Sequence, residues 1–175
     1  MNFLETALNF IFPPVCGICG KMKESYLCKE CQTKIENEPV LLNKTDDYVT
    51  KYFSTHTYLF SYTTPIREKI LQYKFKEQAY LANMFSEFFV KNEKICGFLQ
   101  KYDIIIPVPM TKKKVRKRGY NQSELIVKQI AKKIPNLKLE SRILVKTNEN
   151  RTQSSLNKKQ RQENVKDVYK IQNAE

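Results

Sequence analysis

Tryptophan and long apolar runs are missing from this 175-residue sequence, which also holds only four glycines and a single histidine. No run approaches the roughly 20 apolar residues that a membrane-spanning helix needs. Residues 1–12 contain no Lys or Arg, whereas a signal peptide begins with positive charge. Their apolar residues fall on one helical face, which predicts a short amphipathic helix ended by Pro13 and Pro14. We therefore expect a cytoplasmic protein with no transmembrane segment, in which paired cysteines bind metal rather than form disulfides.

The composition excludes a disordered chain, since 41% of the residues are hydrophobic and 11% are aromatic. The length allows one modest core and a small appendage. The net charge of +13 is concentrated in residues 111–161, which hold 16 Lys and Arg against three acidic residues, while the rest of the chain holds 15 of each sign. Such a field favours an anionic partner, which is a phosphate compound, nucleic acid or a membrane surface. The alternative is a solvated Lys-rich surface with no partner.

Four of the five cysteines form the pattern C-x2-C-x8-C-x2-C, namely Cys16, Cys19, Cys28 and Cys31. Each C-x2-C pair brings two thiolates within reach of one ion, and two pairs complete a tetrahedral zinc shell. Gly17 and Gly20 suit the tight backbone of the first pair. A redox C-x-x-C needs only one such motif, so the doubled pattern favours zinc. Four thiolates leave no open coordination position, and the predicted zinc is therefore structural.

The order of patterns predicts two parts. Residues 1–47 hold the amphipathic helix, a zinc module (residues 1–36) and a linker, and residues 48–175 form a larger α/β domain. In the larger part, residues 52–62 predict a strand or hairpin, a helix begins near Pro65, and another spans about residues 78–89.

Residues 103–109 are a β-branched run bounded by proline, which predicts a fully buried strand of parallel type. Asn121 suits the cap of a following helix with a broad apolar stripe that ends near Pro135. Residues 137–145 and 165–171 predict two further strands. Strand, helix and strand in this order indicate a βαβ unit and an α/β fold with a parallel sheet.

Ligands in such folds bind beyond the carboxyl ends of the strands. Here residues 111–119 predict a basic loop that leads into a helix N-terminus. Backbone N–H groups and the helix dipole make such a position suitable for binding phosphate. Residues 150–155 and the basic residues after them predict a second anion-binding segment. For either segment alone, a solvated charged loop is an equal alternative. The predicted diphosphate- or nucleic-acid-binding residues are Lys112, Lys113, Lys114, Arg116, Lys117, Arg118, Gly119, Asn121, Gln122, Arg151, Gln153 and Arg161.

An ordered set of motifs resembles the ComF family of phosphoribosyltransferase-like proteins, which are associated with DNA uptake in naturally competent bacteria. These motifs are Phe12-Pro13-Pro14-Val15-Cys16 with the four cysteines, Pro107-Val108-Pro109, Arg118-Gly119-Tyr120-Asn121-Gln122, and Arg151-Thr152-Gln153 with Arg161 and Asn164-Val165. They cover about residues 10–170. The resemblance implies a zinc ribbon on a type I phosphoribosyltransferase-like fold. It also implies that the loop after Pro107 is the diphosphate loop and that residues 151–161 form a flexible loop.

The sequence departs from the family pattern in one respect. The family continues with a strand, two acidic residues and a Thr-Thr-Gly-x-Thr turn that holds the 5-phosphate of phosphoribosyl diphosphate. Here Thr63-Thr64 is the only Thr-Thr pair, and no glycine follows Gly119. We therefore expect a truncated product, a fragment or an incomplete gene model, with an incomplete sheet; the alternative is a natural short variant. A bound Mg²⁺ is expected only in a complete homologue.

Two functions remain open. The first is an accessory protein of DNA uptake and natural transformation that binds single-stranded DNA or a phosphate-bearing small molecule. Other DNA-uptake proteins, such as a competence helicase, are its further candidate partners. The alternative is a phosphoribosyltransferase acting on phosphoribosyl diphosphate, inactive in this chain because the phosphate turn is missing. We assign no catalytic residues.

Overall fold

The computed structural model describes residues 10, 13–35, 40–43, 54–148 and 156–172, and the chain divides into two compact units. The N-terminal unit is Met1–Leu99 and the C-terminal unit is Gln100–Glu175. The predicted domain boundary after residue 47 lies outside the described residues. So does the helix predicted over residues 1–12, Phe10 apart.

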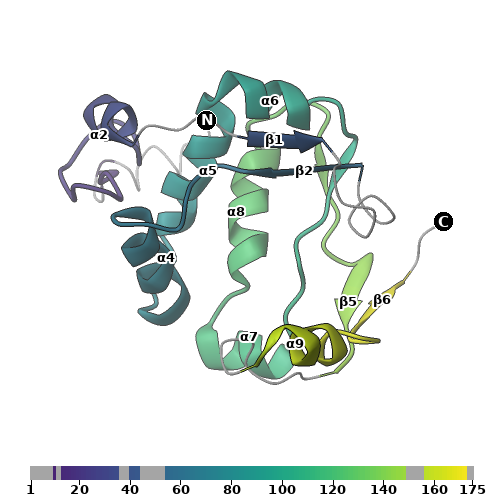
Figure 1. Ribbon diagram of the computed structural model, residues 1–175. Helices are drawn as coiled ribbons and strands as arrows, with labels where there is room; N and C mark the ends of the chain where they lie inside the picture. Colours follow the sequence, from purple (N-terminus) through teal and green to yellow (C-terminus); the bar gives the residue numbers. More distant parts are fainter. Residues whose placement is uncertain (1–9, 11–12, 36–39, 44–53, 149–155, 173–175) are drawn as a thin grey trace. The chain divides into compact units, whose positions relative to one another are not determined.

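Within its described residues, the N-terminal unit contains α2 (Lys29–Lys34), β1 (Val40–Asn43), β2 (Thr55–Tyr58), α4 (Ile66–Phe75), α5 (Leu81–Lys91) and α6 (Glu93–Leu99) (Figure 1). The predicted helices near Pro65 and over residues 78–89 are confirmed as α4 and α5. Apolar side chains of α5 recur at helical spacing and are buried, among them Leu81, Met84, Phe85 and Phe88. The Phe85 ring lies 5.5 Å from the Tyr73 ring of α4, measured between centroids. This aromatic contact closes the core between the two helices.

Strands β1 and β2 form an antiparallel pair in which Val40 is opposite Tyr58 and Asn43 is opposite Thr55 (Figure 1). A strand within residues 52–62 is thus confirmed. The expectation of a linker over residues 36–47 is wrong for Val40–Asn43. Val40 favours an extended conformation, and β2 supplies the hydrogen-bonding partner that a linker would lack.

Within its described residues, the C-terminal unit contains β3 (Ile104–Ile105), α7 (Lys112–Arg118), α8 (Gln122–Ala131), β4 (Lys138–Leu139), β5 (Leu144–Lys146), α9 (Lys158–Asn164) and β6 (Tyr169–Ile171). Strands β3 and β4 are parallel, and the Lys138 N–H donates to the Asp103 carbonyl at 2.8 Å. Helix α8 contacts β4 and buries Ile130. The predicted strand–helix–strand unit with parallel strands is therefore confirmed.

Two strand predictions need correction. Residues 137–145 form two short strands rather than one, because β4 pairs with β3 while β5 pairs antiparallel with β6. The segment 103–109 is extended, but only Ile104–Ile105 forms a strand. Ile104, Ile106 and Val108 are exposed by 45%, 37% and 58%. Among the described residues β3 has a partner on one edge only, so a β-branched sequence did not produce a fully buried strand.

Candidate functional site

The sulfur atoms of the four cysteines Cys16, Cys19, Cys28 and Cys31 all lie within 4.8 Å of one another. The first pair sits in a tight turn closed by the Cys16 N–H, which donates to the Lys21 carbonyl at 2.9 Å. Gly20 completes this turn with a φ of +73°, a left-handed conformation that glycine adopts without strain. The predicted role of Gly20 in the turn is therefore confirmed.

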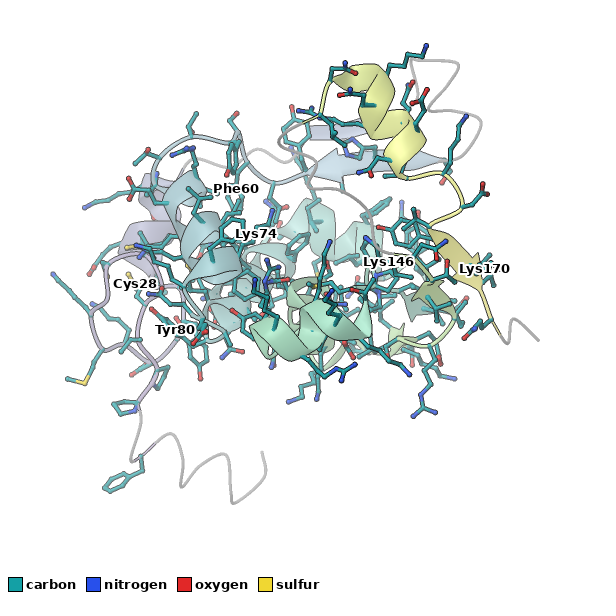
Figure 2. The ribbon with its side chains drawn as sticks, turned by 90° about the horizontal axis from the view of Figure 1, so that it is seen from below. Cys28, Phe60, Lys74, Tyr80, Lys146 and Lys170 are labelled. Atoms are coloured by element: carbon teal, nitrogen blue, oxygen red, sulfur yellow. The ribbon has the colours of Figure 1, made fainter. Side chains whose placement is uncertain are left out.

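The second pair is placed by the start of α2. Cys28 is the residue that caps this helix and Cys31 lies in its first turn, so both sulfurs lie on one side of the helix. The Gln32 N–H donates to the Cys28 carbonyl at 2.9 Å and fixes the first helical turn. Figure 2 shows the Cys28 side chain in this part of the N-terminal unit.

The thiols of the cluster differ in pKa, because their surroundings differ. Burial alone would raise the pKa of Cys16. Hydrogen bonds from the backbone of Cys28, Cys19 and Ile18 outweigh burial and lower the pKa of Cys16 to about 6. For Cys31, burial and then the neighbouring sulfurs of Cys28, Cys19 and Cys16 raise its pKa. A cation held among the four sulfurs would compensate their mutual repulsion, as in four-thiolate zinc sites.

The donor set fits zinc. Four sulfurs at mutual distances below 4.8 Å suit one tetrahedral ion, and three of the four cysteines are buried. Bound zinc would cross-link the turn at Cys16 to the helix that follows Cys28. It would stabilise this fold and would leave no open position for chemistry.

Position 17, inside the first cysteine pair, needs glycine for a reason different from the tight backbone that was predicted. A Cβ added there would lie 2.5 Å from Met84 Sδ and 2.9 Å from Met84 Cβ, both on α5. Gly17 is therefore required because α5 packs directly against the first cysteine turn, whereas its own backbone conformation is ordinary.

The second candidate site is the basic segment, and the expectation of a loop over residues 111–119 is wrong. The segment forms helix α7, with the Thr111 hydroxyl accepting from the Lys114 N–H at 3.4 Å. Gly119 ends the helix in a left-handed conformation (φ +86°), and its N–H donates to the Val115 carbonyl at 2.7 Å. This N–H already has an acceptor within the helix.

Helical geometry divides the six cations of α7 into two groups. Lys114 and Arg118 are half-buried together with Val115, on the side of the helix that faces the protein. The other four are exposed and, at about 100° per residue, share one face. This exposed cationic face consists of Lys112, Lys113, Arg116 and Lys117.

Asn121 and Gln122, which follow Gly119, connect α7, α8 and the extended segment before them through side-chain hydrogen bonds. The Arg118 guanidinium donates to Gln122 Oε1 at 2.9 Å. Asn121 caps α8 by accepting from the Ser123 N–H at 3.1 Å, and its amide donates to the Val108 carbonyl at 3.1 Å. Asn121 is thus confirmed as a helix cap that also fixes the preceding extended segment. Ligand binding by Gly119, Asn121 and Gln122 stays a prediction.

The second predicted anion-binding segment is described only in part. Arg151 and Gln153 lie outside the described residues. Arg161 lies exposed on helix α9 (Lys158–Asn164), so the end of the segment that the resemblance describes as a flexible loop is helical. Asn157 and Gln160 form a reciprocal capping box at the start of α9.

Sequence reasoning missed Glu87, whose carboxylate is buried and bonded to the backbone just before Cys28. A signal was present in the sequence. Glu87 lies between Ser86 and Phe88 in the largely apolar sequence of α5, and an acidic residue in such a position is rarely buried without dedicated partners.

The chain thus contains a four-cysteine cluster that could hold a metal ion and a basic α/β unit. Competence protein F of Haemophilus influenzae is 26% identical over 163 residues, which cover 90% of this chain and 64% of that relative. Competence protein ComFC of Bacillus subtilis is 24% identical over 127 residues, 70% of this chain and 47% of that relative. These matches support the assignment of the chain to the ComF family, as its ordered motifs predicted.

The chain spans less than two thirds of the length of either curated relative. No family model matches the chain, and no solved structure matches it. Among the described helices, none has both the length and the apolar character needed to cross a bilayer.

Proposed function

We propose that this chain is a ComF-type protein of DNA uptake that binds single-stranded DNA, or another phosphate-bearing ligand, through the exposed cationic face of α7. Both curated relatives are named for competence. The observation that carries the proposal is that four cations project together from one short helix while the other two lie on its inner side.

The charge of the C-terminal unit supports this proposal. Residues 100–175 hold 19 Lys and Arg and 7 Asp and Glu, so that 19 minus 7 gives +12 of the total charge of +13. The antiparallel strands β5 and β6 add cations to the same unit, including Lys146 and Lys170 (Figure 2). The Lys146 ammonium also lies 5.5 Å from the centroid of the Tyr169 ring.

The mechanism of binding is electrostatic. Each lysine or arginine that neutralises a phosphate releases a condensed counterion, so affinity falls linearly with salt on a logarithmic plot, by about 0.7 per contact for single strands. Six cations within the seven residues of α7 repel one another, and a bound polyanion relieves this repulsion. Such binding carries little sequence preference.

We propose a cytoplasmic location, because four thiolate ligands need a reducing compartment. We further propose that the parallel β3–α8–β4 arrangement begins a phosphoribosyltransferase-like sheet. The proposed partners, besides single-stranded DNA, are other DNA-uptake proteins such as a competence helicase.

The test compares two charge-reversal variants with wild type across a salt series, using a labelled single-stranded oligonucleotide and fluorescence anisotropy. Arg116→Glu/Lys117→Glu removes two cations from the exposed face and should flatten the salt slope by about 1 to 2. Lys21→Glu/Lys94→Glu changes the total charge equally at two exposed lysines of the N-terminal unit and should do much less. Equal weakening by both pairs would show that only total charge matters and would contradict the proposal.

The enzyme alternative has its own test. Calorimetry with phosphoribosyl diphosphate and Mg²⁺ measures whether the chain binds the transferase substrate. Micromolar, magnesium-dependent binding would favour the phosphoribosyltransferase reading, whereas DNA binding without it favours the accessory role.

A further inference from the structure

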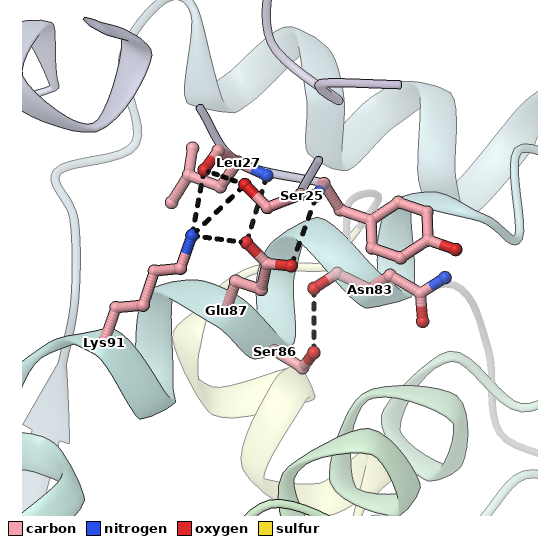
Figure 3. Close-up of polar contacts among 7 residues, drawn as sticks. Ser25, Leu27, Asn83, Ser86, Glu87 and Lys91 are labelled. Atoms are coloured by element: carbon pink, nitrogen blue, oxygen red, sulfur yellow. Dashed lines mark hydrogen bonds and ion pairs between the residues drawn. The ribbon is translucent and has the colours of Figure 1, made fainter. Parts of the chain in front are cut away.

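Helix α5 binds the chain segment that leads directly into the second cysteine pair. Glu87 on α5 is 5% exposed, and its two carboxylate oxygens accept from the backbone N–H groups of Tyr26 at 3.2 Å and Leu27 at 3.1 Å (Figure 3). Leu27 itself is fully buried and immediately precedes Cys28. The carboxylate therefore fixes the backbone one residue before a predicted zinc ligand.

Lys91, one helical turn further along α5, completes this arrangement. Its ammonium lies 2.7 Å from Glu87 Oε2 and donates to the Leu27 carbonyl at 2.9 Å (Figure 3). Both backbone polar groups of Leu27 are thus bonded to side chains of α5. The opposite charge of Lys91 also compensates the burial of the Glu87 carboxylate.

The first cysteine pair is joined to the same contact. The Gly17 N–H donates to the Tyr26 carbonyl at 2.9 Å, and Gly17 packs against Met84 of α5. Both halves of the cysteine cluster therefore rest on one face of α5, although about sixty positions separate Leu27 from Glu87 in the sequence.

We propose that Glu87 and Lys91 act as positioning residues for the zinc centre and that they couple zinc occupancy to the order of α5. They hold residues 25–27, and through these residues the Cys28 sulfur, in the geometry that a tetrahedral ion requires. Removal of outer-sphere partners that bond to the ligands themselves alters metal affinity by about 10- to 100-fold. Glu87 acts on the residue next to Cys28, so we expect an effect at the lower end of this range. The proposal concerns the metal centre and does not depend on DNA binding.

The coupling acts in both directions. If the contacts of Glu87 raise the affinity for zinc by some factor, zinc strengthens those contacts by the same factor, because binding free energies are reciprocal. Loss of the metal should release residues 25–27 and leave the Glu87 carboxylate without its backbone donors. Helix α5 should then open more often than in the metal-bound protein.

The experiment measures zinc release from the full chain. Metal analysis of the wild-type protein should first show one zinc per chain, and zinc release to an excess of a chromogenic chelator then gives a rate. Glu87→Gln should release zinc about 10-fold faster, because an amide cannot accept from both N–H groups. Glu24→Gln is the matched control. It removes an exposed carboxylate of the zinc module and should leave the rate unchanged.

Lys91→Met tests the same contact by a milder change and should raise the release rate about threefold. Exposed Lys94→Met is its control. This second pair decides the question if Glu87→Gln does not fold, as judged by circular dichroism.

Hydrogen exchange distinguishes coupling from a purely structural role. In the wild-type protein, chelation should speed exchange of the α5 amides at least 10-fold, and this difference should shrink in Glu87→Gln. Equal destabilisation of α5 with and without metal, together with unchanged zinc release, would overturn the proposal. Wild-type protein that contains no zinc would also overturn it, and DNA binding would remain a separate question.

Discussion

At the scale of single residues, Gly17 gives the sharpest expectation for stability. Gly17→Ala would place a Cβ 2.5 Å from Met84 Sδ, so that either the cysteine turn or α5 must move. We expect a loss of about 1–3 kcal/mol in the free energy of unfolding, typical of overpacked cores. Denaturant unfolding of metal-loaded protein measures it. Gly97→Ala on α6 meets no atom within 4 Å and should be neutral or slightly stabilising. Equal effects of the two variants would contradict the close packing.

Single residues also show where sequence reasoning ends. The spacing of the cysteines predicted their clustering, because two C-x2-C pairs have few other ways to satisfy four thiolates. The reason for Gly17 was not predictable, since no local pattern identifies the helix that packs against it. Glu87 was missed for the same reason. Its partners are backbone groups about sixty positions away.

At the scale of elements, the conversion of the basic loop into α7 changes how the cations should act. Gly119→Ala forces a left-handed conformation on alanine at the helix end, at a cost of about 1–2 kcal/mol, without altering charge or contacting another atom. If the helix presents the cations, single-stranded DNA should bind about two- to fivefold more weakly with an unchanged salt slope. Anisotropy titration at fixed salt measures this, with Gly97→Ala as the control. Undiminished affinity would mean that the cations act without the helix.

The signals for α7 were present in the sequence, although a loop was predicted. Lysine and arginine have high helix propensity, Thr111 suits the N-cap, and Gly119 suits the position after the last turn. The position of the segment between a predicted strand and a predicted helix suggested a loop, but these local signals prevailed. The opposite error affected residues 103–109. Their β-branched residues predicted a strand correctly at Ile104–Ile105, yet burial depends on neighbouring strands, which composition does not specify.

At the scale of the whole molecule, charge and apolar surface lie in the same unit. The C-terminal unit carries nearly all of the net charge, and it also exposes Ile104, Ile106 and Val108 in alternation along one extended segment. An apolar row of this kind favours association between copies of a chain. Mutual repulsion of chains with a charge of +13 opposes that association at low ionic strength.

The exposed apolar row therefore has a consequence for colloidal behaviour. Salt shortens the range of electrostatic repulsion, to about 3 Å at 1 M. The high salt that would dissociate a polyanion would therefore also weaken the repulsion between copies of the chain. We expect light scattering of the free chain to rise with salt concentration, and Ile106→Lys to suppress the rise. Scattering that stays flat in wild type would show that the row is harmless. For this chain, the proposed binding of nucleic acid and a dispersed solution would both be favoured by low ionic strength.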